Sequence, residues 1–168
     1  MATQTQDGVR IASIDPVRVY VARATAAGFG PQFIGPVVGP LFDRLADQLR
    51  EAGLSPDLPA IAWYVALDDD QGQVQVNASF SAGAGAGLGP VEGQAFEVVE
   101  LPAIEQAAVV AHVGPPDTIG EGWMALSDWL PAHGYAPAGP GREVYLSGAE
   151  VPMEEWVTEL QYPVRAEG

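Results

Sequence analysis

The sequence contains no cysteine and no lysine, and both absences narrow what the protein can do. Without cysteine it has no disulfide, no thiolate zinc site and no cysteine nucleophile. Arginine supplies all seven basic residues, scattered from Arg10 to Arg165, whereas 22 residues are acidic, so the net charge is −15. Nucleic-acid binding normally needs a basic patch, so no direct contact with DNA or RNA is expected. A negative field favours cationic small molecules, or simply keeps the protein in solution.

Long hydrophobic runs and metal-binding patterns are also missing. No apolar stretch is long enough to cross a bilayer, and the first residues, MATQTQDGVR, lack the basic and apolar regions of a secretory signal. We therefore expect no membrane partner and a cytoplasmic location. The two histidines, His112 and His133, do not form a His-x-x-x-His pair, so no metal site is expected. No motif indicates a cofactor, because the Gly/Ala-rich residues 81–93 lack Gly-x-Gly-x-x-Gly spacing.

The chain reads as one domain, residues 1–168, made of two similar halves. A Gly/Ala-rich linker, residues 81–94, separates a first repeat at 14–80 from a second repeat at 95–164. Alternating apolar residues predict strands, and apolar residues at helical spacing predict one helix in each half. The first half gives a strand at 17–25, a helix within 31–53, and strands at 60–67 and 73–80. The second gives a strand at 95–114 that Pro102 interrupts, a helix around 118–134, and strands at 142–147 and 156–164.

This order predicts an α+β fold, a tandem repeat of strand-helix-strand-strand units with pseudo-twofold symmetry. Its antiparallel sheets would carry helices on one face and form a central ligand cleft on the other. The prolines and glycines of FIGPVVGP, residues 33–40, fit either a mobile lid over that cleft or a kinked start of the helix.

Strand alternation sorts side chains between the two faces. In the first half, the row of Ile61, Trp63 and Val65 is expected against the helix. Tyr64 then lies on the open face among small residues, and Tyr20 follows the same pattern in the strand at 17–25.

In the second half the alternation places a carboxylate on the open face. Val144 and Leu160 are expected to face the core, so Glu143, Tyr145, Glu159 and Gln161 point into the cleft with Tyr64. A carboxylate in an apolar site must be paired or hydrogen-bonded. Tyrosine hydroxyls can supply the hydrogen bonds, and aromatic rings attract a cation. The same carboxylate could instead act as a general acid or base.

Several motifs of the second half resemble the GyrI-like small-molecule-binding family. The segment HVGPPDTIGEGWMALSDWLPAHGYAPAGPGREVYLS, followed by EEWVTELQYPV, carries them: His-x-Gly-Pro, Trp-Leu, Gly-Tyr-x-Pro-x-Gly, Arg-Glu-x-Tyr and Thr-Glu-Leu-Gln-x-Pro. The family includes effector-binding domains of multidrug-sensing transcription regulators. The match is clear across 95–164 and mainly architectural across 14–80. No DNA-binding module fits beside the repeats, so a stand-alone member is expected.

The resemblance implies that the ligand-contacting glutamate of the family is Glu159, with Tyr145 and Tyr64 as pocket tyrosines. Tyr20, Trp63, Trp123, Trp156 and Gln161 complete the predicted ligand-binding residues, although Trp123 also fits the apolar stripe of the helix at 118–134.

Three functions remain open from the sequence. The first is a binding protein for aromatic or cationic small molecules, in drug sequestration or detoxification. The second, implied by stand-alone members of the family, is a hydrolase that opens the cyclopropane of DNA-alkylating natural products, with Glu159, Tyr145 and Tyr64 as catalytic residues. The third is a protein inhibitor directed at gyrase, whose acidic surface engages a basic DNA-binding enzyme.

Overall fold

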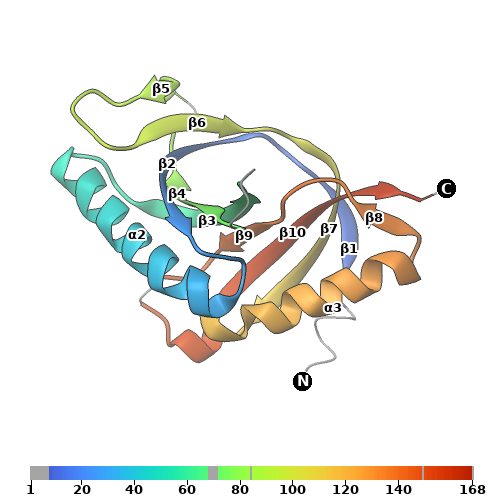
Figure 1. The fold of residues 1–168 in the computed structure, drawn as a ribbon. Helices are drawn as coiled ribbons and strands as arrows, with labels where there is room; N and C mark the ends of the chain where they lie inside the picture. Colours follow the sequence, from blue (N-terminus) through green and yellow to red (C-terminus); the bar gives the residue numbers. More distant parts are fainter. Residues whose placement is uncertain (1–7, 68–71, 84, 149, 168) are drawn as a thin grey trace. The chain divides into compact units, whose positions relative to one another are not determined.

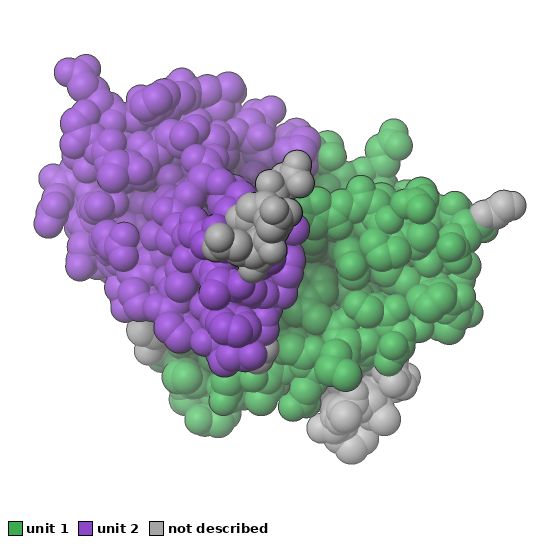
Figure 2. Space-filling model, in the orientation of Figure 1, with its two compact units in different colours: residues 1–15, 103–168 green, residues 16–102 purple. Residues whose placement is uncertain are grey.

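A computed structural model describes residues 8–67, 72–83, 85–148 and 150–167 (Figure 1). It contains α-helices and antiparallel strands, so the predicted α+β class is confirmed. The chain divides into two compact units, coloured separately in Figure 2. Unit 1 comprises Met1–Asp15 and Ala103–Gly168, and unit 2 comprises Pro16–Pro102.

Unit 2 is a five-stranded antiparallel sheet with one helix. Its elements are β2 (Val17–Ala26), α2 (Pro31–Glu51), β3 (Asp57–Ala66), β4 (Val74–Ser81), β5 (Gly89–Pro90) and β6 (Glu97–Leu101). The strand order is β3-β4-β2-β6-β5. The helix packs on β2 and β4. These two strands are the first and the last of the strand-helix-strand-strand order, and they lie side by side at the centre of the sheet.

Unit 1 repeats this layout. Its elements are β1 (Arg10–Ile14), β7 (Ile104–Val113), the 3₁₀ turn η1 (Pro116–Thr118), α3 (Ile119–Ala132), β8 (Tyr135–Pro137), β9 (Arg142–Tyr145), η2 (Met153–Glu155) and β10 (Val157–Ala166). The strand order is β1-β7-β10-β9, and β8 pairs with the end of β10. Both units thus show the predicted order of strand, helix, strand and strand.

The compact units do not follow the predicted limits of the repeats. As predicted, the strand at 95–114 is interrupted at Pro102, which has no N–H to continue a ladder. Its first part, β6, pairs with β2 and belongs to unit 2. In the same way β1, which directly precedes β2, pairs with β7 and belongs to unit 1. The predicted linker also contains β5, which pairs with β6.

The face of unit 2 that carries α2 is the reverse of the one predicted. Residues directly opposite one another in an antiparallel ladder project to the same face, and Tyr64 lies opposite Val76, which lies opposite Ala24. This row packs with Leu41 under α2, whereas Trp63 belongs to the other face with Asn77. The small side chains beside Tyr64 in this row leave space for the leucines of α2. This row therefore meets the helix, and the row of Ile61, Trp63 and Val65 does not.

In unit 1 the helix α3 packs closely on the sheet through glycine. Leu126 and Leu130 contact a core that includes Leu160, which confirms the expected inward direction of Leu160. A Cβ added at Gly122 would lie 2.8 Å from Leu160 Cδ1. Since Leu160 is fully buried, it cannot move aside at low cost. Glycine at position 122 therefore sets the distance between α3 and β10.

We predict opposite effects for alanine at two glycines of α3. Gly122→Ala should lower the free energy of unfolding by roughly 1–3 kcal/mol through overpacking against Leu160. Gly120→Ala is the matched control, because a Cβ there has no neighbour within 4 Å, and it should raise that free energy by about 0.5–1 kcal/mol through helix propensity. Urea denaturation followed by circular dichroism measures both. Equal changes in the two variants would contradict the close packing inferred here.

Candidate functional site

Glu159 lies near the start of β10 and already has a cationic neighbour. Its Oε2 atom is 3.7 Å from Nη2 of Arg10, and its Oε1 atom accepts a 2.8 Å hydrogen bond from Nε2 of Gln161. The Glu159 side chain is 24% exposed. Glu159 is therefore a partly solvated member of an ion pair, although Gln161 lies beside it as predicted.

The structure does not bring Glu159 and Tyr145 together. In the pairing of β9 with β10, Tyr145 lies opposite Thr158, and Glu159 lies opposite Val144. Neighbouring positions along a strand project to opposite faces. Tyr145 packs against the core under α3, so Glu159 points away from that helix. Val144 is buried as expected, but it lies on the face of Glu159 and not on the face of Leu160.

A different carboxylate lies beside Tyr145 on the face that carries α3. Glu143 is only 7% exposed. Its Oε2 atom accepts a 2.8 Å hydrogen bond from Nε1 of Trp123, and its Oε1 atom accepts a 2.5 Å hydrogen bond from the hydroxyl of Tyr145. Two residues on β9 and one on α3 thus form a buried polar group within unit 1.

Two further residues fix the indole of Trp123. The ring of Tyr162 on β10 meets it edge-on, with centroids 5.6 Å apart and planes at 89°. Gly141 also lies close to the indole, and a Cβ added there would be only 2.4 Å from Cη2 of Trp123. The side chains of Trp123, Glu143, Tyr145 and Tyr162 are called the Glu143 cluster below. Glycine at 141 is needed for the indole to reach the carboxylate.

The Glu143 cluster combines a sheltered negative charge with aromatic surface. Two neutral donors, the indole N–H of Trp123 and the phenol O–H of Tyr145, stabilise the carboxylate of Glu143. Such a group attracts a cation strongly where water is excluded, and it can also exchange a proton. Arg142, the residue before it, is buried and lies opposite Gln161 on the other face. Burial lowers the pKa of the Arg142 guanidinium.

The remaining predicted residues have other surroundings. In unit 2, Tyr20 stacks edge-on with Phe96 at 5.9 Å, Tyr64 packs under α2, and the backbone carbonyl of Trp63 accepts a 3.2 Å hydrogen bond from Nδ2 of Asn77. In unit 1, Nε1 of Trp156 donates to the carbonyl of Val151 at 3.0 Å. Trp123 is therefore the predicted tryptophan that meets a carboxylate.

Both histidines have structural partners. Nε2 of His112 lies 2.9 Å from Oγ1 of Thr118 at the start of α3, and the ring of His133 stacks on Trp129 at 3.9 Å. Within the described part of the chain, no group of three or more histidine, aspartate or glutamate side chains is placed to hold a metal ion. The helices of that same part include none with the length and apolar character needed to cross a membrane.

Sequence reasoning missed Glu143, although the signal was present. It placed Glu143 and Tyr145 on one face of the strand at 142–147, and the structure confirms that they share a face. The sequence also has a tryptophan on the apolar stripe of the preceding helix. The sequence signal for Glu143 was a carboxylate two residues before a tyrosine, on a strand row that faces the helix.

The fold resembles that of several solved proteins. The C-terminal domain of EcmrR is 24% identical, with a TM-score of 0.69 over 94% of this chain and 97% of that one. SAV2435 bound to tetraphenylphosphonium is 12% identical, with a TM-score of 0.65 over 94% and 93%. A hydrolase from Listeria innocua is 11% identical, with a TM-score of 0.60 over 94% and 92%. At these identities the likeness establishes the fold alone.

Sequence comparison assigns the chain to a family, which the likeness of folds does not. No curated protein matches it significantly. A family model for the GyrI-like small molecule binding domain matches residues 9–165, which is nearly the whole chain. The chain therefore belongs to the GyrI-like small-molecule-binding domain family.

Proposed function

We propose that the protein binds aromatic, apolar, cationic small molecules at the Glu143 cluster of unit 1. The observation that carries this proposal is the buried carboxylate of Glu143, held by Trp123 and Tyr145 at 2.8 and 2.5 Å. Membership of a small-molecule-binding family supports a ligand of this size class. The proposal transfers the ligand-binding role expected of Glu159 to Glu143.

The chemistry of the cluster favours cations that carry apolar surface. An aromatic ring attracts a cation by roughly 0.5–2 kcal/mol, and the indole and phenol rings here surround a carboxylate. Both carboxylate oxygens already accept a hydrogen bond from a ring donor. A permanently charged ligand without N–H groups therefore suits the site. SAV2435, a protein of the same fold, is bound to such a cation, tetraphenylphosphonium.

The biological role that fits this chemistry is sequestration or detoxification of cationic compounds. The net charge of −15 raises the local concentration of cations around the protein. EcmrR in complex with DNA shares the fold, but this chain covers only 57% of that longer chain. Binding without DNA contact is accordingly the activity proposed for the described residues.

We expect Glu143→Gln to weaken the binding of tetraphenylphosphonium by about tenfold or more, equivalent to ~1.4 kcal/mol. The substitution keeps the shape of the side chain and removes its charge. Isothermal titration calorimetry gives the dissociation constant, and circular dichroism checks the fold. Glu159→Gln is the matched control and should leave the dissociation constant unchanged. Loss of binding in Glu159→Gln, with normal binding in Glu143→Gln, would assign the site to Glu159 instead.

A second test moves the tryptophan without touching the carboxylate. Gly141→Ala places a methyl group where the indole of Trp123 now lies, so the ring must shift and its hydrogen bond to Glu143 must lengthen. We expect several-fold weaker binding of tetraphenylphosphonium and a changed tryptophan emission maximum. Gly139→Ala is the control, because its Cβ would make only an ordinary 3.7 Å contact with Pro163. Identical affinities in the two variants would separate Trp123 from ligand binding.

Hydrolysis is the second candidate function, and the short contact between Tyr145 and Glu143 favours it. Glu143 would take a proton from water as the water oxygen bonds to a carbon of a conjugated cyclopropane. The breaking C–C bond would pass its electron pair to the conjugated carbonyl, which receives a proton from Tyr145. Incubation with a cyclopropane-bearing alkylating compound, followed by mass spectrometry, tests this. A gain of one water that Glu143→Gln and Tyr145→Phe both abolish is expected, and recovery of unchanged compound from the wild type would exclude it.

A further inference from the structure

Unit 2 contains a small cavity that takes no part in the cation site proposed above. Its volume is about 330 Å³, near the lower limit of ligand pockets, which span roughly 300–1,000 Å³. The lining residues come from around the start of β2, from the end of β4 and from β6. They are Pro16, Val17, Arg18, Ala82 and Glu100. A cavity of this size suits one small molecule.

The cavity is lined by one cation and one anion, which form an ion pair. Arg18 and Glu100 lie opposite each other in the ladder of β2 and β6. Nε of Arg18 donates a hydrogen bond to Oε1 of Glu100 at 3.3 Å, and Nη1 of Arg18 donates to the backbone carbonyl of Ala86 at 2.5 Å. Contacts to two different segments therefore hold the guanidinium in place.

Each member of this ion pair keeps one polar atom for a ligand. Among the described residues, no protein group is hydrogen-bonded to Nη2 of Arg18 or to Oε2 of Glu100. The two side chains are 30% and 46% exposed, so a molecule from solution can reach both. A guanidinium N–H binds a carboxylate oxygen, and a carboxylate oxygen binds an ammonium group. A ligand with both charges therefore satisfies both atoms while the existing ion pair stays intact.

The other walls of the cavity are small and apolar. Pro16, Val17 and Ala82 present aliphatic surface and no charge. Because opposite charges lie side by side, the cavity does not favour the permanent cations that the Glu143 cluster attracts. Simple anions are disfavoured as well, since the net charge of the protein is −15. These features favour a ligand that has a charge of each sign, no net charge and a short aliphatic group.

We propose that this cavity binds an apolar α-amino acid in its zwitterionic form. The carboxylate of the ligand accepts hydrogen bonds from Nη2 of Arg18, and its ammonium group donates to Oε2 of Glu100. Its aliphatic side chain packs on Pro16 and Val17. An α-amino acid carries its two charged groups on one carbon, which matches a side-chain pair that is itself in contact at 3.3 Å. The site is distinct from the Glu143 cluster and takes a different class of ligand.

Three related molecules test whether both charges are needed by the wild-type chain. L-Leucine has both charges, 4-methylpentanoate has only the carboxylate, and 3-methylbutylamine has only the ammonium group. L-Leucine should bind at least about tenfold more tightly than either analogue, because each analogue leaves one charged side chain of the cavity without a partner. Isothermal titration calorimetry gives the affinities. Equal affinities for the three molecules, or no binding of L-leucine, would overturn the proposal.

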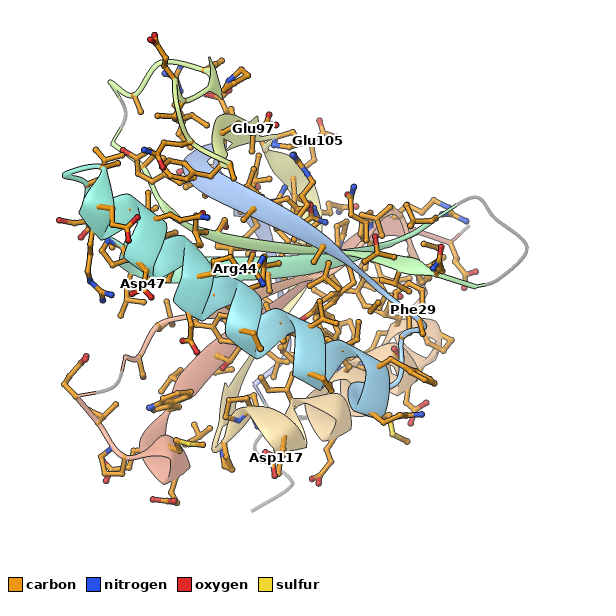
Figure 3. All side chains as sticks on the ribbon, turned by 60° about the vertical axis from the view of Figure 1, so that its left-hand side comes forward. Phe29, Arg44, Asp47, Glu97, Glu105 and Asp117 are labelled. Atoms are coloured by element: carbon orange, nitrogen blue, oxygen red, sulfur yellow. The ribbon has the colours of Figure 1, made fainter. Side chains whose placement is uncertain are left out.

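Substitutions in two ion pairs of the same strands locate the site. Arg18→Gln and Glu100→Gln should each weaken the binding of L-leucine by about tenfold or more. Arg23→Gln is the matched control, because Arg23 also joins β2 to β6 but does not line the cavity. Its Nη1 atom lies 3.0 Å from Oε2 of Glu97, which is labelled in Figure 3. Arg23→Gln should bind L-leucine like the wild type, and circular dichroism checks the fold of each variant.

The two proposed sites are tested separately. Glu143→Gln should bind L-leucine like the wild type, and Arg18→Gln should bind tetraphenylphosphonium like the wild type, so failure of one site is distinguishable from failure of the other. Undiminished binding of L-leucine in both Arg18→Gln and Glu100→Gln would contradict the amino-acid site. An equal loss in Arg23→Gln would contradict it too, because the effect would then belong to the pairing of β2 with β6 and not to the cavity.

Discussion

The buried carboxylate of Glu143 needs hydrogen-bond donors close to it, and the packing of unit 1 brings them there. A charge that is 7% exposed is costly unless hydrogen bonds replace its water, and here the replacements come from Trp123 on α3 and Tyr145 on β9. The indole reaches the carboxylate only because α3 approaches β10 closely. Gly122 permits that approach over Leu160, and Gly141 leaves space for the ring itself. Two glycines distant in sequence thus serve the same hydrogen bond.

The two units share a plan but carry different side chains on the face beneath the helix. In unit 1, Tyr145 follows Glu143 by two positions on β9, and both face α3. In unit 2, Tyr64 follows Ala62 by two positions on β3, where Ala62 is opposite Ala78 and the row faces α2. A tyrosine is therefore common to the two helix-facing rows, whereas only one row has a charge. Duplication supplies the scaffold, and this difference gives the units distinct chemistry.

The sequence predicted the elements well and their faces less well, for a physical reason. Leucines at helical spacing around Leu45 and Leu126 identified the helices, and alternation identified strands such as β3 and β10. Alternation alone does not decide which of two apolar rows meets the helix. In β3 the bulkier row around Trp63 was expected there, but the small row accommodates the leucines of α2. The same ambiguity in β9 placed Tyr145 with Glu159. Strand pairing across the predicted limits of the repeats, as for β1 and β6, depends on distant partners and left no local signal.

How firmly each helix is held to its sheet follows from the same difference between the two helix-facing rows. The helix α3 lies over a buried charge whose hydrogen-bond donor it supplies, so displacement of α3 would leave Glu143 without the bond from Trp123. That penalty keeps α3 close to its sheet. The first half of α2 lies over a largely apolar cluster that includes Tyr64, and exposure of apolar surface costs free energy in proportion to its area. Prolines at 36 and 40 are tolerable there for that reason, whereas the proline of α3, Pro131, is confined to its last turn. A polar hydrogen bond thus holds α3 to its sheet, whereas apolar packing holds the first half of α2.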